Sequence, residues 1–298
     1  MEKESGFFKN QLFAGQAAVF MCAVLWSSSG LFIKLVDWHP ALITGSRSVL
    51  SVFTLLFLRR FIEPVRKPGN TLALLASGFW YGITMILFVF ANKLTTSANV
   101  ILLQYTSPIW AALLGWFMLK EKPHWEHYAA LLFIGPGMFL ILSGGLASGG
   151  MKGDIIAIIS GLTFGINSVV LRKHKDTNSL DIMIGSHLVC VLFSIPFFFL
   201  YPPQLSVGSI LSIVYMGIFQ LGLACGLFVY GLKRITAVQS MLIVAIEPVL
   251  NPLWVLLILG ERPTNLAIAG GCFILAAVIC SSLITNKRAA KLAASCQQ

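Results

Sequence analysis

One stretch of this sequence reads FVFANKLTTSANVILLQYTSPIWAALLGWFMLKEKP from Phe88 to Pro123, and a related stretch, FVYGLKRITAVQSMLIVAIEPVLNPLWVLLILGERP, runs from Phe228 to Pro263. The two are offset by 140 residues without a gap, and ten of their 36 positions are identical. Shared leucines carry little weight in apolar segments, but Pro108 matches Pro248 and both stretches end in Glu-x-Pro. The chain therefore contains an internal duplication.

The composition indicates which solvent surrounds most of this chain. Of its 298 residues, 57% are hydrophobic and 11% are charged, and the mean hydropathy is +0.85. A soluble domain averages about 25% charged residues and could not bury this much apolar surface in one core. The net charge of +10 does not indicate nucleic acid, because the basic residues form short runs between apolar segments and no aromatic-interleaved patch. We expect a lipid bilayer as the surrounding partner, and no nucleic acid.

Ten apolar stretches follow one another with short connectors. Each has about the 17–25 residues that a membrane-spanning helix needs. They cover residues 12–36, 40–58, 71–92, 97–119, 125–142, 154–171, 181–201, 208–232, 237–259 and 266–284. The first is too long for a signal-peptide core and is interpreted as a retained helix. We predict an all-α integral membrane protein with ten transmembrane helices and no soluble domain.

The distribution of Lys and Arg predicts how the chain is oriented. With the N-terminus inside, 16 of the 21 basic residues fall on the inner side and four on the outer side, while Arg47 lies within a span. Both termini are therefore predicted to be cytoplasmic. Because five helices per half is an odd number, the two halves, 12–142 and 154–284, must be inverted relative to each other, and 285–298 is a cytoplasmic tail. Inverted repeats are a recurrent plan of secondary transporters.

The sequence offers no set of residues suited to catalysis or metal binding. No C-x-x-C or Cys/His ligand spacing occurs among the six cysteines, which are Cys22, Cys190, Cys225, Cys272, Cys280 and Cys296. There is no H-E-x-x-H motif and no nucleotide-binding G-x-x-x-x-G-K-[ST] motif. We therefore predict no enzyme activity, no metal, no cofactor and no ATP hydrolysis by the chain itself.

The duplicated stretches resemble a known family. The residues that carry the resemblance lie in Lys93–Pro123 and Thr236–Pro263, together with Trp26–Lys34 and Arg47. They are similar to the EamA domain of the drug/metabolite transporter superfamily. The resemblance implies two five-helix units around a central cavity lined largely by helices 1, 3, 4, 6, 8 and 9, and it implies export of amino acids or other metabolites, or in some members import. The second unit departs from the pattern with His187 in place of arginine.

Three ionisable side chains lie far from both ends of the predicted spans: Arg47, His187 and Glu247. Charges in lipid are costly, so each should face the bundle interior and find a partner. At the rise of an α-helix, Arg47 lies about 10 Å below the outer surface and His187 about 9 Å from the inner surface. One interpretation makes them substrate- or gate-contacting groups on opposite sides of the membrane. The interpretation that we favour for Arg47 is a structural cation bonded to helix-end carbonyls.

Glu247 lies close to the predicted midplane, directly before Pro248, and its equivalent in the first half is Ser107. We predict that Glu247 is a proton-coupling site or meets a substrate ammonium. The alternative is a protonated glutamic acid hydrogen-bonded between helices, which costs far less in lipid than a carboxylate.

The matched prolines, Pro108 and Pro248, are candidates for coupling or gating. Each lacks an N–H and should free the carbonyl four residues earlier, at Gln104 and Val244. Paired helix breaks at mid-depth point to the binding site of a transporter. The alternative is a pair of ordinary kinks.

Ten further polar or aromatic side chains at mid-span are candidates for contact with substrate: Trp26, Ser29, Trp80, Tyr81, Gln104, Tyr105, Asn167, Tyr215, Gln220 and Asn251. A cavity that mixes rings and amides suits an amino acid or a similar small amphipathic solute. We predict a secondary transporter that carries such a metabolite across the inner (cytoplasmic) membrane by alternating access, with protons as the candidate coupling ion. Export is the leading hypothesis, uptake of a metabolite or vitamin is the alternative, and a channel is less favoured. Both a monomer and a homodimer remain open.

Overall fold

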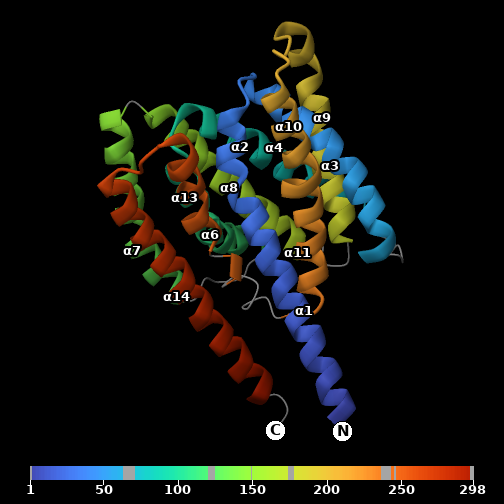
Figure 1. The fold of residues 1–298 in the computed structure, drawn as a ribbon. Coiled ribbons are helices and arrows are strands. Elements are labelled where there is room, and N and C mark those ends of the chain that lie inside the picture. The colour runs from blue at the N-terminus through green and yellow to red at the C-terminus, as the bar shows by residue number, and fades with distance from the viewer. Residues whose placement is uncertain are drawn as a thin grey trace.

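The computed structural model describes residues 2–62, 71–119, 125–148, 150–173, 178–235, 243–244 and 246–295. Within these ranges the chain is helical and contains no β-strand. Figure 1 shows the helices as one bundle with both termini at the same end. The helices are α1 Glu2–Ser27, α2 Ser29–Leu35, α3 Pro40–Ile62, α4 Thr71–Leu94, α5 Ser97–Gln104, α6 Ser107–Leu119, α7 Trp125–Ser148, α8 Met151–Lys173, α9 Ser179–Leu200, α10 Val207–Tyr215, the π-helix η1 Met216–Leu223, α11 Ala224–Leu232, α13 Glu247–Leu259 and α14 Asn265–Ser295.

Seven helical segments among the described residues are long and apolar enough to cross a membrane: Gln11–Leu35, Pro40–Ile62, Leu74–Leu94, Ser97–Met118, Met151–Val170, Ser179–Leu200 and Val207–Leu232. Shorter apolar helices lie at Leu132–Gly144, Glu247–Leu259 and Asn265–Ala277, within or across the three remaining predicted stretches. Every predicted stretch thus contains an apolar helix, and the multi-pass membrane class is confirmed. The number of ten spans stays a prediction.

Four stretches predicted as single helices are interrupted within the described residues. The first breaks at Ser28, where the hydroxyls of Ser27 and Ser28 donate to the carbonyls of Val24 and Leu25 over 2.7 and 2.6 Å. Such back-bonding competes with the helix ladder and bends the helix. The fourth stretch breaks between α5 and α6, just before Pro108, the eighth contains the π-helix η1, and the ninth breaks just before α13 begins at Glu247. The last helix, α14, continues into the predicted tail 285–298.

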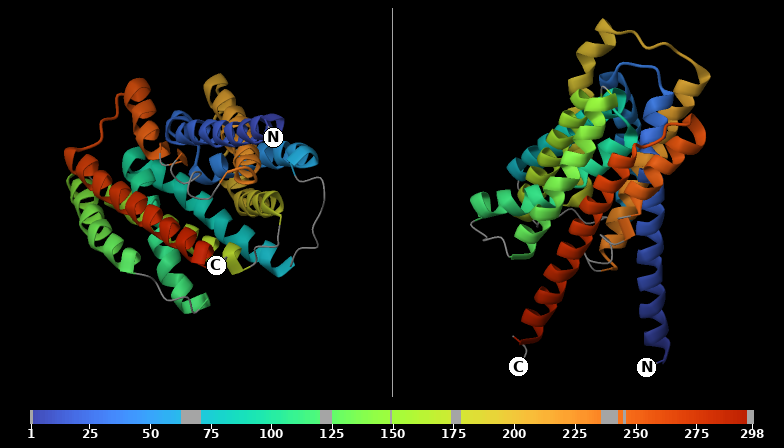
Figure 2. Two further views of the ribbon diagram at one scale, coloured as in Figure 1. Left: turned by 90° about the horizontal axis from the view of Figure 1, so that it is seen from below. Right: turned by 90° about the vertical axis from the view of Figure 1, so that its left-hand side faces the viewer.

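Equivalent helices of the two halves pack against each other. Along α3, Gly45 lies against Ser194 of α9, whereas Arg59 forms an ion pair with Asp181 of α9, so these two helices run antiparallel. The same holds for α7 and α14, which lie side by side along one edge of the bundle (Figure 2). A Cβ on Gly137 would lie 2.8 Å from the Gly270 carbonyl oxygen, so side chains are excluded where these helices cross.

The other contacts between the halves come in related pairs. Helix α1 packs on α11 and α8 packs on α4, while α1 also contacts α13 and α8 contacts α6. A shift of 138 to 140 residues converts each contact into the other. Two similar units related by a two-fold axis produce this pattern.

The largest cluster of buried apolar side chains joins both halves. It includes Ile33 of α2, Ile43 of α3, Val89 of α4, Ile101 of α5 and Met216 of η1. Large apolar side chains are also exposed on the outer faces of many helices, as expected where lipid is the solvent. The helices therefore hold a shared interior against which the site residues are positioned.

Candidate substrate and coupling site

Two helix breaks, one from each half, meet inside the bundle. Helix α5 ends at Gln104 and α6 begins at Ser107, while α13 begins at Glu247 with Pro248 in its first turn. Proline has no N–H, so the carbonyl of Val244 cannot be satisfied by residue 248. The predicted break is therefore present before each matched proline, although the side chain of Pro108 lies outside the described residues.

One hydroxyl connects these breaks. Tyr105 Oη lies 3.0 Å from the Val244 carbonyl oxygen and 3.1 Å from Glu247 Oε2. A phenol has a single proton to donate. Both contacts are hydrogen bonds at the same time only when Glu247 is protonated and donates to Tyr105 Oη, which leaves the phenol proton for Val244. When Glu247 is ionised, its carboxylate accepts the hydrogen bond from the phenol, and the Val244 carbonyl loses its donor.

The break in the first helix lies beside the same site. Asn251 Nδ2 of α13 donates to Ser29 Oγ over 3.3 Å, and Trp254 Nε1 donates to Ser27 Oγ over 2.9 Å. Both serines flank the interruption between α1 and α2. Helix α13 is thus joined through side chains to α1 and α2. A movement of either element would therefore displace Glu247 at the start of α13.

Several predicted substrate-contact residues lie near α1, α2 and α13. Tyr215, at the end of α10, lies with its hydroxyl 3.2 Å from Ser28 Oγ, and its ring packs at a tilt against Phe32 with ring centroids 4.2 Å apart. Trp26 packs at a tilt against Phe228, with ring centroids 5.1 Å apart. With Ser29, Asn251 and Tyr105, these side chains combine aromatic faces and hydrogen-bonding groups around the helix breaks, and their contact with substrate stays a prediction.

Other predicted residues are engaged by the fold itself. Asn167 Oδ1 accepts a hydrogen bond from Ser77 Oγ over 2.6 Å, and Gln104 Nε2 donates to Ser160 Oγ over 3.0 Å. Trp80 meets Phe79 edge-on, and Tyr81 stacks on Phe164. Gln220 is buried on η1, and its Oε1 has no hydrogen-bond partner among the described residues. For Asn167 or Gln104 to contact substrate, its hydrogen bond to the serine hydroxyl would have to be replaced by one to the substrate.

The structure corrects two expectations for Arg47 and His187. They do not lie on opposite sides, because His187 Nδ1 is 3.2 Å from Ser48 Oγ, next to Arg47 in the chain. Arg47 is the eighth of 23 residues in α3 and His187 the ninth of 22 in α9. Each position lies about one turn from the middle of its helix, so both residues lie in the middle part of the bundle, and His187 contacts the residue that follows Arg47.

Arg47 is also not bonded to helix-end carbonyls as expected. Its side chain is 2% exposed, and neither Nε nor Nη1 has a hydrogen-bond partner among the described residues. The buried His187 Nε2 is without such a partner in the same part of the chain. The pair forms a buried polar cluster between α3 and α9, separate from the Tyr105–Glu247 contact.

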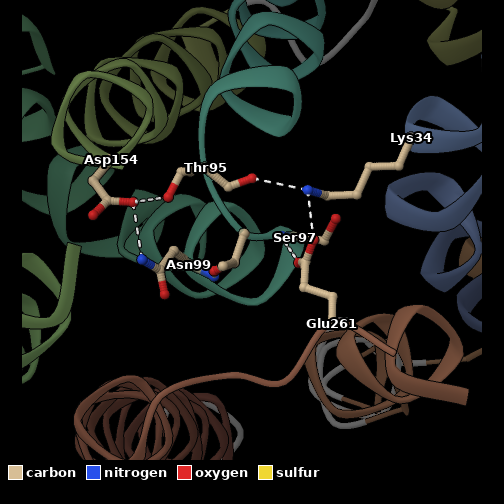
Figure 3. A network of polar contacts seen from close by, with 7 residues as sticks. Lys34, Thr95, Ser97, Asn99, Asp154 and Glu261 are labelled. Atoms are coloured by element: carbon tan, nitrogen blue, oxygen red, sulfur yellow. Dashed lines mark hydrogen bonds and ion pairs between the residues drawn. The ribbon is translucent and has the colours of Figure 1, made fainter. Parts of the chain in front are cut away.

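The sequence reasoning missed a polar network at the end of the bundle away from the termini (Figure 3). Lys34 Nζ lies 2.7 Å from Glu261 Oε2 and donates to the Thr95 carbonyl over 3.1 Å. The Ser97 N–H donates to Glu261 Oε1 over 2.9 Å. In the sequence, Lys34 and Glu261 belong to stretches that resemble the EamA domain, Lys34 also counts toward the topology and Glu261 toward the Glu-x-Pro match, but none of these patterns predicts the contact.

A second part of the network involves a buried carboxylate. Asp154 Oδ1, in the first turn of α8, accepts hydrogen bonds from Thr95 Oγ1 over 2.7 Å and from Asn99 Nδ2 over 3.0 Å. Its other oxygen, Oδ2, is buried and has no partner among the described residues. The turn between α4 and α5 is thereby held by groups of both halves.

Known proteins of similar sequence cover nearly the whole chain. An uncharacterized transporter of Archaeoglobus fulgidus is 25% identical over 271 residues, which are 89% of this chain and 95% of the relative. The uncharacterized transporter YoaV of Bacillus subtilis is 21% identical over 287 residues, 91% of this chain and 97% of the relative. The solute carrier family 35 member G1 of Mus musculus is 29% identical over 169 residues, but these cover 51% of this chain and 46% of that protein.

A solved crystal structure shares the fold, with a TM-score of 0.64 and 20% sequence identity over 91% of this chain and 97% of the other. The model of the EamA-like transporter family matches twice, at residues 13–143 and 151–283. These matches confirm the resemblance seen in the duplicated stretches. The chain is a multi-pass membrane transporter and belongs to the EamA-like transporter family.

Proposed function

We propose that this protein is a secondary carrier that exchanges protons for a small metabolite, an amino acid or a similar amphipathic solute, across the cytoplasmic membrane. The observation that supports it most is the shared proton of Tyr105, which lies between Glu247 and the Val244 carbonyl. The protonation state of Glu247 decides which acceptor the phenol serves. A titration at this site therefore changes the hydrogen bonding of a broken helix.

The proposal assigns alternate states to that change. With Glu247 protonated, the Val244 carbonyl is satisfied and the break before α13 is held against α5. With Glu247 ionised, the part-buried Val244 carbonyl lacks its donor, which costs up to about 1–3 kcal/mol unless water or a substrate donor replaces the phenol. A substrate ammonium meets both needs, because it pairs with the carboxylate and donates to the carbonyl. Proton and solute would then compete for one place, as antiport requires.

The architecture within the proposal is ten spans in two inverted units, 12–142 and 154–284, with both termini in the cytoplasm. The antiparallel pairing of α3 with α9 and of α7 with α14 supports it. The bias of 16 inner against four outer basic residues supports the orientation. In such an arrangement the two units can rock about the shared centre and open one end at a time.

The substrate class is argued from the groups near the breaks. The rings of Trp26, Tyr105 and Tyr215, the carboxyl of Glu247 and the amide of Asn251 are the candidate groups, and this mixture fits an amphipathic amine better than a sugar or a polyanion. Export is the favoured direction because proton entry can then drive the solute outward. Uptake of a metabolite or vitamin by the same fold is the alternative, and a channel is less favoured.

The test is transport by the purified protein in liposomes. Radiolabelled amino acids, nucleobases and vitamins are screened for counterflow, and active solutes are then followed with and without a pH gradient. The proposal expects saturable, competed exchange that the gradient accelerates. Flux that neither saturates nor responds to an excess of unlabelled solute would identify a pore instead.

A further inference from the structure

The network of Figure 3 joins the halves of the chain at one end only a few residues from the site. Lys34 is the next-to-last residue of α2, the short helix that also carries Ser29, and Glu261 follows α13, which carries Asn251. The ion pair of 2.7 Å therefore closes the same two helices that line the proposed site.

The geometry indicates more than a loose surface contact. The Lys34 and Glu261 side chains are 19% and 25% exposed. Both also bond to the backbone of the turn between α4 and α5, at the Thr95 carbonyl and the Ser97 N–H. Charged groups held by further hydrogen bonds in a partly desolvated place interact more strongly than exposed pairs.

We propose that the ion pair between Lys34 and Glu261 is a gate of the transport path, and that the present conformation has this gate closed. The inference rests on the proposed function, in which the halves separate at one end at a time. In the proposed orientation this is the outer end. Opening it requires the Lys34–Glu261 pair to break, since its two residues come from opposite halves.

The chain offers a matched control. Arg59 of α3 and Asp181 of α9 also pair across the halves, with Arg59 Nε 3.1 Å from Asp181 Oδ1 and side chains 24% and 17% exposed. This pair lies toward the opposite end of antiparallel helices that contact each other along their length. Breaking it removes a similar interaction without touching the gate.

The experiment measures the distance across the outer end by pulsed electron paramagnetic resonance. Spin labels are placed at the exposed positions Asp37 and Arg262 of the full chain, with all six native cysteines replaced, in lipid nanodiscs without solute. Lys34→Met and Glu261→Gln should each lower the ratio of short to long distances about tenfold. Because either change alone breaks the pair, the double variant should open no further than the single ones.

A control variant completes the design. Asp181→Asn should leave the distance distribution as in the parent. Unchanged distances in both gate variants, or equal opening by Asp181→Asn, would overturn the gate. Since no solute is present, these outcomes are independent of whether proton-coupled transport is found.

Discussion

Replacing Glu247 with glutamine should hold the site in its proton-loaded form. The glutamine amide can donate to the Tyr105 hydroxyl oxygen. The phenol therefore keeps donating its hydrogen bond to the Val244 carbonyl, as it does beside the protonated acid. The hydrogen bonds around the break are then preserved while the titration is lost. The coupling of transport to protons should disappear, and the protein should remain folded.

The size of the effect follows from one proton per transport cycle. A proton that crosses a pH difference of one unit supplies about 1.4 kcal/mol, equivalent to a solute ratio of about ten. The parent protein should therefore reach about tenfold accumulation per pH unit, and Glu247→Gln should reach equal concentrations on both sides. Tyr105→Phe, which leaves the Val244 carbonyl without its donor, should lower the free energy of unfolding by about 1–3 kcal/mol.

The assay uses liposomes with an imposed pH gradient and the solute identified by counterflow. Ser107→Ala serves as the control, because Ser107 holds the place of Glu247 in the first half and carries no titrating group. Glu247→Gln should keep exchange at equal pH and lose gradient-driven accumulation, whereas Ser107→Ala keeps both. Accumulation by Glu247→Gln at the parent level would refute the assignment of the proton to this carboxyl.

Three further predictions concern stability, each read from thermal unfolding in detergent. Gly270→Leu should destabilise the protein by about 1–3 kcal/mol, because a Cβ there collides with the Gly137 carbonyl. Gly115→Ala should not destabilise it, because nothing lies within 4 Å of a Cβ at that position. Equal loss of stability in both variants would count against the Gly270–Gly137 contact. Arg47→Met should stabilise the protein by about 1–4 kcal/mol. The change replaces a buried guanidinium, whose Nε and Nη1 have no partner among the described residues, by an apolar side chain. A large loss of stability would show that Arg47 has a partner in solution. Burial lowers the pKa of His39 from 6.5, so the stability that its neutral form contributes is complete above that pH and is lost as the pH falls through the lowered pKa. His39→Phe should flatten the pH dependence of the unfolding temperature below pH 6.5.

The helix positions and the two breaks were accessible from sequence because both depend on local chemistry. Apolar length predicts a span, and a proline without an N–H predicts the free carbonyl of Val244. The residue that donates a hydrogen bond to this carbonyl is Tyr105, and it belongs to the other half of the chain. Its partnership depends on how two helices dock, which no local pattern encodes.

The errors have the same origin. Arg47 and His187 were placed by counting residues from the nearest helix end, although contact depends on the alignment of α3 with α9. Lys34 enters the sequence prediction as an outer basic residue and Glu261 as part of the Glu-x-Pro match, yet side chains at helix ends approach each other only when the turns between helices are folded. Depth along one helix is readable from sequence, whereas the neighbour across the bundle is not.

The wide turn of η1 has a consequence for how this helix relates to its counterpart. A π-helical turn accommodates one residue more than an α-helical turn, so the side chains of α11 are rotated by about 100° from where an uninterrupted α-helix starting at α10 would direct them. Helix α4, at the equivalent place in the first half, is α-helical throughout. Because α11 contacts α1 much as the end of α4 contacts α8, the difference falls on α10, whose side chains are turned relative to those of the first part of α4. A substrate between the two units would therefore meet different side chains on its two sides.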